Sequence, residues 1–188
     1  MSADSPFVLG ITGATGMLFL HAFLKVAREE NISLHAIISQ AGRRVLELES
    51  GVEAEALPGI ERWFAADDFA ATPSSGSSCY RGMVILPCTM GTLAAVASGF
   101  SINLIHRAAA VALKERRRLV LAVRETPLGR AHLQNMLTAH DAGAIICPTM
   151  PSYYLKPASL EEAAETWAWR LLDQLDPELE ITGRRRWK

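Results

Sequence analysis

Short apolar runs alternate along this chain with longer stretches in which apolar residues recur every three or four positions. The short runs are apolar at almost every position, which is typical of parallel strands buried on both faces. The longer stretches have the spacing of amphipathic helices. We expect strands at 7–12, 34–38, 83–86, 119–123 and 144–147. We expect helices at 17–29, 41–50, 92–97, 104–115, 130–140 and 160–175.

This alternation predicts an α/β fold: a doubly wound, mostly parallel sheet of the Rossmann or flavodoxin-like kind, in three layers. With 188 residues the chain suits a single domain over 1–188 better than two. The segment 53–78 breaks the pattern with Pro58, Pro73 and a Ser-Ser-Gly-Ser-Ser run, so we expect a long connection there with a short helix at most. We expect residues 175–188 to form a C-terminal tail that packs near the functional site.

Charge and composition narrow the classes of function. The formal net charge is −1, which gives no general attraction to nucleic acid or to an anionic membrane. No apolar run reaches the roughly 18 residues of a membrane span, and the N-terminus lacks the layout of a signal peptide. The three cysteines form no CxxC pair and the five histidines form no HExxH motif. We therefore expect a metal-free protein of the reducing cytoplasm.

In an open parallel sheet, ligands bind beyond the carboxyl ends of the strands. The segments that follow the expected strands are 13–16, 39–40, 87–92, 124–127 and 148–151. They are rich in small and hydroxyl side chains, and one of them carries Arg124. Small residues allow close backbone approach, while hydroxyls and helix N-terminal amides bind phosphate. This edge of the sheet therefore looks built for a phosphorylated ligand.

Each of these segments also has a purely structural interpretation. Residues 13–16 could form a tight turn with Thr15 as an N-cap, and Arg124 could form an ordinary ion pair with Glu125. The expected helix 104–115 adds Arg107 and Lys114, which are seven residues apart and so project from one face. They could form a solvated basic face, or they could bind an anionic second substrate beside the phosphate site.

Short motifs follow one another in order from about residue 7 to 187. They are GITGATG at 10–16, SGS at 75–77, GMVILPC at 82–88, NLIHRAA at 103–109, LKERR at 113–117, RETPL at 124–128, HL at 132–133, NM at 135–136, YY at 153–154, RLLD at 170–173 and RW at 186–187. Taken together, this set resembles the UbiX/Pad-type flavin prenyltransferases over essentially the whole chain.

The resemblance implies an enzyme that transfers a dimethylallyl group from dimethylallyl phosphate to N5 and C6 of reduced FMN, without a metal. It also implies that a UbiD-type decarboxylase receives the prenylated FMN. The enzyme would be a homo-oligomer, a dodecamer if it follows the family, with a site shared between subunits. The four tryptophans are a further ground for assembly, since large apolar side chains often lie at contacts: Trp63, Trp167, Trp169 and Trp187.

The resemblance also assigns residues to the site. The FMN contacts would be Gly13, Ala14, Thr15, Ser39, Thr89, Met90, Gly91, Thr92 and Arg124. The dimethylallyl phosphate contacts would be Arg107, Lys114, Arg124, Tyr154 and Arg170, converging on one phosphate beside the flavin ring. Glu125 would be the acid/base carboxylate, with Arg107 and Lys114 also catalytic because fixed positive charge helps a phosphate to leave. Trp187 would cover the site.

The chain departs from the family pattern at several positions. Thr15 and Thr89 stand where Ser is usual, which keeps the hydroxyl, and Gly91 stands where Lys is frequent. Ile102 and Ala110 stand where Asp is frequent, Gln134 stands where Glu is common, and Tyr153 stands where Phe is usual. They leave open an FMN-binding paralogue without prenylation activity. A cysteine-peptide decarboxylase-like flavoprotein is a further alternative, although 148–154 lacks the Pro-Ala-Met-Asn type of segment that such enzymes use.

Overall fold

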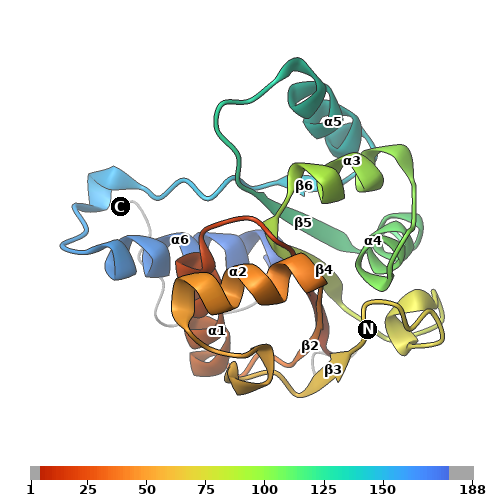
Figure 1. Cartoon of the computed structure of the whole chain (residues 1–188), viewed down its shortest axis with the longest axis horizontal. Coiled ribbons are helices and arrows are strands. Elements are labelled where there is room, and N and C mark those ends of the chain that lie inside the picture. The colour runs from red at the N-terminus through yellow and green to blue at the C-terminus, as the bar shows by residue number, and fades with distance from the viewer. Residues whose placement is uncertain (1–4, 178–188) are drawn as a thin grey trace.

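The computed structural model describes residues 5–177 and contains one six-stranded parallel sheet. The strands lie in the order β3-β2-β1-β4-β5-β6, so the chain runs outward from β1 to one edge, returns, and continues to the other edge (Figure 1). The strands are β1 Phe7–Ile11, β2 Leu34–Ile38, β3 Arg62–Phe64, β4 Gly82–Cys88, β5 Arg118–Val123 and β6 Ile145–Ile146.

Helices cover both faces of the sheet. On one face lie α1 Met17–Glu29, α2 Gln40–Ser50 and α6 Leu160–Leu175; on the other lie α3 Met90–Ser98, α4 Leu104–Lys114 and α5 Arg130–Asp141 (Figure 1). Short 3-10 turns are η1 Ala54–Ala56, η2 Thr72–Ser74 and η3 Tyr153–Leu155. The predicted three-layer, doubly wound fold in a single domain is confirmed.

The alternation of side chains along β1 produces two hydrophobic cores. Phe7, Leu9 and Ile11 point into the core beneath α1 and α6, whereas Val8 points into the core beneath α3 and α4. Gly10 lies on the second side, where a Cβ would be 3.0 Å from Ile105 of α4. Both faces of the strand are therefore filled, which explains why the run is apolar at every position.

The prediction for residues 53–78 was partly wrong, because this segment contains the edge strand β3. β3 pairs in parallel with β2, with His35 opposite Arg62 and Ile37 opposite Phe64. Of its three residues only Phe64 is buried, so no apolar run marks the strand in the sequence. The segment is a strand because it pairs with the backbone of β2.

Two of the tryptophans are core residues of the single chain. Trp167 and Trp169 of α6 are 4% and 8% exposed, and Trp167 packs edge-to-face on Phe19 of α1 with ring centroids 5.0 Å apart. Neither can supply the contacts between copies that we expected from some of the tryptophans. Trp63 is half-buried, and Trp187, with the rest of the predicted tail beyond residue 177, lies outside the described residues.

Within residues 5–177 no helix is both long and apolar enough to cross a membrane. Over the same range, no group of three or more His, Cys, Asp or Glu side chains is arranged to hold a metal ion.

Candidate functional site

Hydrogen bonds join the loops that follow β1, β2 and β4 at one edge of the sheet. Thr12 Oγ1 donates to the Pro87 carbonyl oxygen at 2.7 Å and accepts from the Thr89 amide at 2.9 Å. The Ser39 amide donates to the Ile11 carbonyl oxygen at 3.0 Å. The structure thus brings the predicted cofactor segments 13–15, 39 and 89–92 together within one chain.

The two predicted cofactor hydroxyls that follow β2 and β4 are helix N-caps. Ser39 Oγ accepts from the Gly42 amide at 3.0 Å at the start of α2. Thr89 Oγ1 accepts from the Thr92 amide at 3.2 Å and donates to Thr92 Oγ1 at 3.0 Å at the start of α3. Capping places these hydroxyls at positive helix ends, where anions are stabilised.

Gly13 lets the loop after β1 pack directly on the first turn of α2. A Cβ at this position would lie 2.5 Å from the Ala41 Cβ and 2.9 Å from the Ala41 carbonyl carbon. Gly16, three residues on, has φ 107°, a left-handed conformation that side-chain-bearing residues rarely adopt. The small residues of the motif are therefore required by the turn and by the approach of α2.

The N-terminus of α1 is capped by Glu49, a residue that sequence reasoning missed. Its carboxylate accepts from the Gly16 amide at 2.9 Å and from the Met17 amide at 2.8 Å. Burial would raise the pKa of Glu49, but hydrogen bonds from Thr15, Met17 and Gly16 and the charge of Arg124 hold that pKa below its usual value. Glu49 thus lies beside two predicted cofactor residues.

An indirect signal for Glu49 existed in the sequence. The cap position Gly16 has no side chain, and the first turn of α1 contains no acidic residue. The free amides of a helix N-terminus need an acceptor, so one had to come from elsewhere in the chain. Nothing in the sequence says that it comes from the last turn of α2.

Arg124 follows β5 at the same edge, where its amide donates to the Cys88 carbonyl oxygen at 3.4 Å. Its Nε is buried and has no hydrogen-bond partner among the described residues. The neighbouring Glu125 is exposed and accepts from the Thr126 amide at 2.9 Å, and the described residues contain no Arg124–Glu125 ion pair. A buried guanidinium nitrogen without an acceptor is costly, which favours a ligand acceptor at this position.

The cations of α4, Arg107 and Lys114, belong to the face of the sheet opposite to α1, α2 and α6. Arg107 Nε donates to the Ser74 carbonyl oxygen at 3.0 Å, and Lys114 forms an ion pair with Glu115. α4 packs on the second core, under α3 and β5, and touches η2. Arg107 and Lys114 share one face of the helix, as their spacing predicted.

Arg170 lies on α6, on the first face, and Tyr154 lies in η3, the turn that precedes this helix. Tyr154 in η3 is 57% exposed, and the Arg170 side chain on α6 is 66% exposed, with its Nη1 3.5 Å from Asp173. Trp167 Nε1 donates to the Pro148 carbonyl oxygen at 2.9 Å, which holds the segment before η3 on α6. Because α4 and α6 cover opposite faces of the sheet (Figure 1), one chain does not bring Arg107 and Lys114 to Tyr154 and Arg170.

The two thiols nearest this edge are unsuited to nucleophilic chemistry. Burial raises the pKa of Cys88 to about 12. Burial likewise raises the pKa of Cys147 to about 11, although the charge of Arg170 opposes this. Because the thiolate is the reactive form, neither side chain is prepared to attack a substrate.

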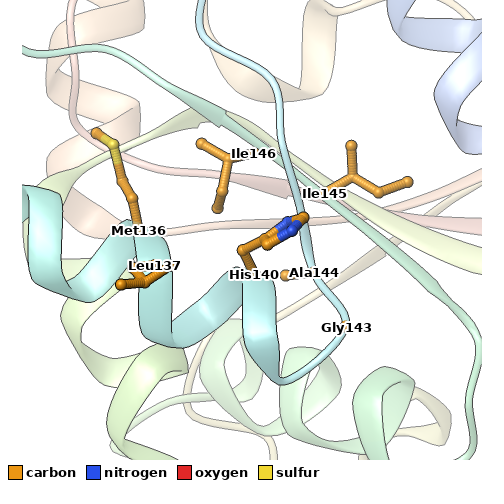
Figure 2. Close-up of a pocket in the computed structure, with 7 residues that line it drawn as sticks. All are labelled: Met136, Leu137, His140, Gly143, Ala144, Ile145 and Ile146. Atoms are coloured by element: carbon orange, nitrogen blue, oxygen red, sulfur yellow. The ribbon is translucent and has the colours of Figure 1, made fainter.

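An open, mostly apolar hollow of about 480 Å³ lies on the second face, between α5 and β6. Figure 2 shows Met136 and His140 rising from α5 toward the side of Ile145 and Ile146 of the edge strand. Leu133 and Leu137 of α5 are each 53% exposed. Ala139 is the only buried residue of α5, a helix that lies wholly within the described range, so Leu133 and Leu137 are among the side chains that it presents to the outside.

The chain matches the Flavoprotein family over residues 1–167. It is 44% identical over 188 residues to the flavin prenyltransferase UbiX of Methanothermobacter thermautotrophicus, covering 100% of this chain and 97% of that protein.

Two solved structures are close in fold as well. The crystal structure of AnUbiX (PadA1) in complex with FMN and dimethylallyl pyrophosphate matches with a TM-score of 0.93 and 39% identity, covering 98% of each chain. A dodecameric FMN-dependent Ubix-like decarboxylase from Escherichia coli O157:H7 matches with a TM-score of 0.91 and 38% identity, covering 97% of this chain and 99% of that one. This chain therefore belongs to the Flavoprotein family and, within it, to the flavin prenyltransferases of the UbiX type.

Proposed function

We propose that this protein binds FMN at the carboxyl edge of its sheet and transfers the dimethylallyl group of dimethylallyl phosphate to N5 and C6 of the reduced flavin. The observation that carries the proposal is the unpartnered, buried Nε of Arg124 beside the capped helix starts of α2 and α3. Together, Arg124 and these helix starts give the carboxyl edge positive charge and hydroxyl groups, in a chain of the UbiX type. The enzyme is a metal-independent prenyltransferase.

The residues of this edge fit FMN. The α1 N-terminus is already occupied by the Glu49 carboxylate, so a second anion there would be repelled. The first turn of α3 is open instead, since nothing lies within 4 Å of a Cβ built on Gly91. We assign the cofactor phosphate to this turn, with the ring system near Arg124. The full set of residues that would hold FMN is Gly13, Ala14, Thr15, Ser39, Thr89, Met90, Gly91, Thr92 and Arg124.

Reduced FMN supplies the nucleophilic N5 and C6 atoms that accept the allyl carbons. The cations hold the phosphate of the donor and stabilise the charge it gains as its bond to the allyl carbon breaks. Closing the second bond at C6 requires one proton to be added to the middle carbon of the allyl group and one to be removed from C6, with no net release. We assign this transfer to Glu125, which is exposed next to Arg124. Glu49, hydrogen-bonded to Thr15, is a second carboxylate next to the assigned cofactor residues, and its lowered pKa keeps it ionised.

The donor phosphate site requires two copies of the chain. Arg124, Tyr154 and Arg170 come from one copy, and Arg107 and Lys114 come from a neighbouring copy, because α4 and α6 lie on opposite faces. The apolar hollow between α5 and β6, lined in part by Leu137, supplies a surface for contact between copies (Figure 2). Leu133 of the same helix is exposed as well. A dodecamer, as in the E. coli relative, is the assembly we propose.

Prenylated FMN, the product, is itself a cofactor, so a second enzyme must use it. We assign this role to a UbiD-type decarboxylase that takes prenylated FMN from this enzyme. Cys79, Cys88 and Cys147 are free thiols, which suits work in the reducing cytoplasm.

The test is mass spectrometry of the flavin after the protein is incubated anaerobically with FMN, a reductant and dimethylallyl phosphate. We expect a flavin that is heavier by one dimethylallyl group. Unmodified FMN bound to the protein would instead identify an FMN-binding paralogue that lacks turnover, and failure to bind FMN would refute the assigned cofactor edge.

A further inference from the structure

The serine-rich segment 72–78 lies directly against the cations of α4. It was an expected long connection, and nothing in the reaction proposed above uses it. In the structure it contains η2 and contacts α4. We call residues 72–78 the serine-rich turn.

The serine-rich turn is fixed to the body of the domain. Pro73 is buried, and Thr72 Oγ1 lies 2.8 Å from the hydroxyl of Tyr80, which itself is 5% exposed. The Tyr80 hydroxyl also shares a hydrogen bond with His35 Nδ1 of β2, at 3.0 Å. Ser78 Oγ closes the turn by donating to the Thr72 carbonyl oxygen at 2.7 Å. The turn is therefore a rigid support and not a free loop.

The turn orients the Arg107 guanidinium. Arg107 Nε donates to the Ser74 carbonyl oxygen at 3.0 Å, which fixes the plane of the group. No other hydrogen bond or ion pair of Arg107 is formed with the described residues, so its two terminal nitrogens remain to bind a ligand. The terminal pair of a guanidinium matches two oxygens of a phosphate.

Gly76 makes room for Lys114. A Cβ at position 76 would meet the Glu115 carboxylate oxygen, would lie 2.5 Å from Lys114 Nζ and would lie 2.8 Å from Glu115 Cδ. The Gly76 carbonyl oxygen also accepts from Arg117 Nη2 at 2.6 Å, which ties the turn to the connection between α4 and β5. The ammonium group of Lys114 thus occupies a space that exists only because residue 76 has no side chain.

We propose that the serine-rich turn sets the positions of the two cations that bind the donor phosphate, with Ser74 and Gly76 as positioning residues for Arg107 and Lys114. This inference rests on the proposed function for the identity of the ligand. The turn acts through backbone carbonyl oxygens and through the missing side chain of Gly76, and it does not touch the substrate itself.

The test is Gly76→Ala in the FMN-loaded protein. The atoms that the new Cβ meets are the ends of flexible side chains, so we expect the fold to survive and Lys114 to move. We expect the KM for dimethylallyl phosphate to rise about tenfold, as for the loss of one charge-assisted contact, with little change in FMN affinity or Tm. The matched control is Gly129→Ala, whose Cβ would meet nothing closer than 3.8 Å.

A second-site variant distinguishes the loss of positioning from general damage to the structure. Glu115→Ala removes two of the three atoms that the Cβ of residue 76 would meet. Of the three nearest atoms only Lys114 Nζ then remains, and it can be accommodated by a small shift into the space that the carboxylate vacates, so Gly76→Ala should change the KM by less than about twofold in the Glu115→Ala background. Arg117→Met, which frees the Gly76 carbonyl oxygen, should raise the KM by a smaller factor than Gly76→Ala.

Calorimetric titration with dimethylallyl phosphate and with inorganic phosphate separates this inference from the proposed function. If the wild type binds the donor but leaves the flavin unmodified, the proposed function fails, and the titration still compares Gly76→Ala with Gly129→Ala. The positioning role is overturned if Gly76→Ala binds both ligands as the wild type does, if its loss persists in the Glu115→Ala background, or if the wild type binds neither ligand.

Discussion

Gly13→Ala is expected to destabilise the protein and to weaken FMN binding together. The new Cβ would lie 2.5 Å from the Ala41 Cβ and 2.9 Å from the Ala41 carbonyl carbon. Comfortable carbon–carbon separations are about 3.5–4.0 Å, so the loop after β1 and the start of α2 must separate by roughly 1 Å. Because one of the atoms met belongs to the backbone, no rotamer change can relieve the contact.

Overpacking of this kind costs about 1–3 kcal/mol. For a domain of this size, that corresponds to a fall in Tm of about 2–12 °C. The same displacement moves the Gly13–Thr15 backbone away from Ser39, and binding sites tolerate only about 0.5 Å of such misplacement. We therefore expect FMN affinity to fall about tenfold or more.

The assays are thermal unfolding of the FMN-free protein at fixed protein concentration and titration of FMN by fluorescence. Gly91→Ala is the matched comparison, because it adds a methyl group in the same cradle with nothing within 4 Å. In a helix this change should stabilise the FMN-free protein by up to about 1 kcal/mol. If both variants shift the Tm in the same direction, or if Gly13→Ala binds FMN as the wild type does, the described contact with α2 is wrong.

Three further predictions follow from the site and the surface. The pKa of Glu49 lies below its ordinary value of 4.5, so the carboxylate stabilises the fold above that pH and this stabilisation is lost as the pH falls through the lower folded-state pKa. The difference in Tm between wild type and Glu49→Gln should therefore shrink on acidification. A constant difference would contradict the role of the carboxylate. Arg170→Ala and Tyr154→Phe should each lower prenylation about tenfold or more while FMN binding stays nearly intact. Equal loss of prenylation and of FMN binding would mean that these residues stabilise the fold or bind the flavin. Leu137→Asp should reduce the size of the assembly in light scattering, whereas Leu48→Asp, at a position on α2 that is 76% exposed, should not; an unchanged assembly in Leu137→Asp would place the contact elsewhere.

The sheet, its helical layers and the meeting of the segments that follow the strands at one edge were predictable from the sequence, because they depend on local patterns. A strand buried on both faces is apolar at every position, as β1 and β4 are. Ligands bind where parallel strands end, so Thr89 and Arg124 could be placed at this edge without coordinates. Hydroxyl N-caps such as Ser39 also follow from sequence position alone.

Partners distant in the sequence could not be predicted in this way. β3 is a strand because β2 supplies a hydrogen-bonding backbone, and only one of its three residues is buried. Glu49 appears in the sequence as one more acidic residue on a helix, and only the position of α2 brings it to the amides of Gly16 and Met17. These contacts depend on how elements pack, and no local pattern encodes that packing.

The cations illustrate the same limit. Helical spacing correctly placed Arg107 and Lys114 on one face of α4, since that relation lies within a single helix. Whether they meet Arg170 depends on which side of the sheet each helix covers. The direction of each crossover connection decides this, and it places α4 and α6 on opposite sides. A donor site built from all three residues therefore needs a second copy of the chain.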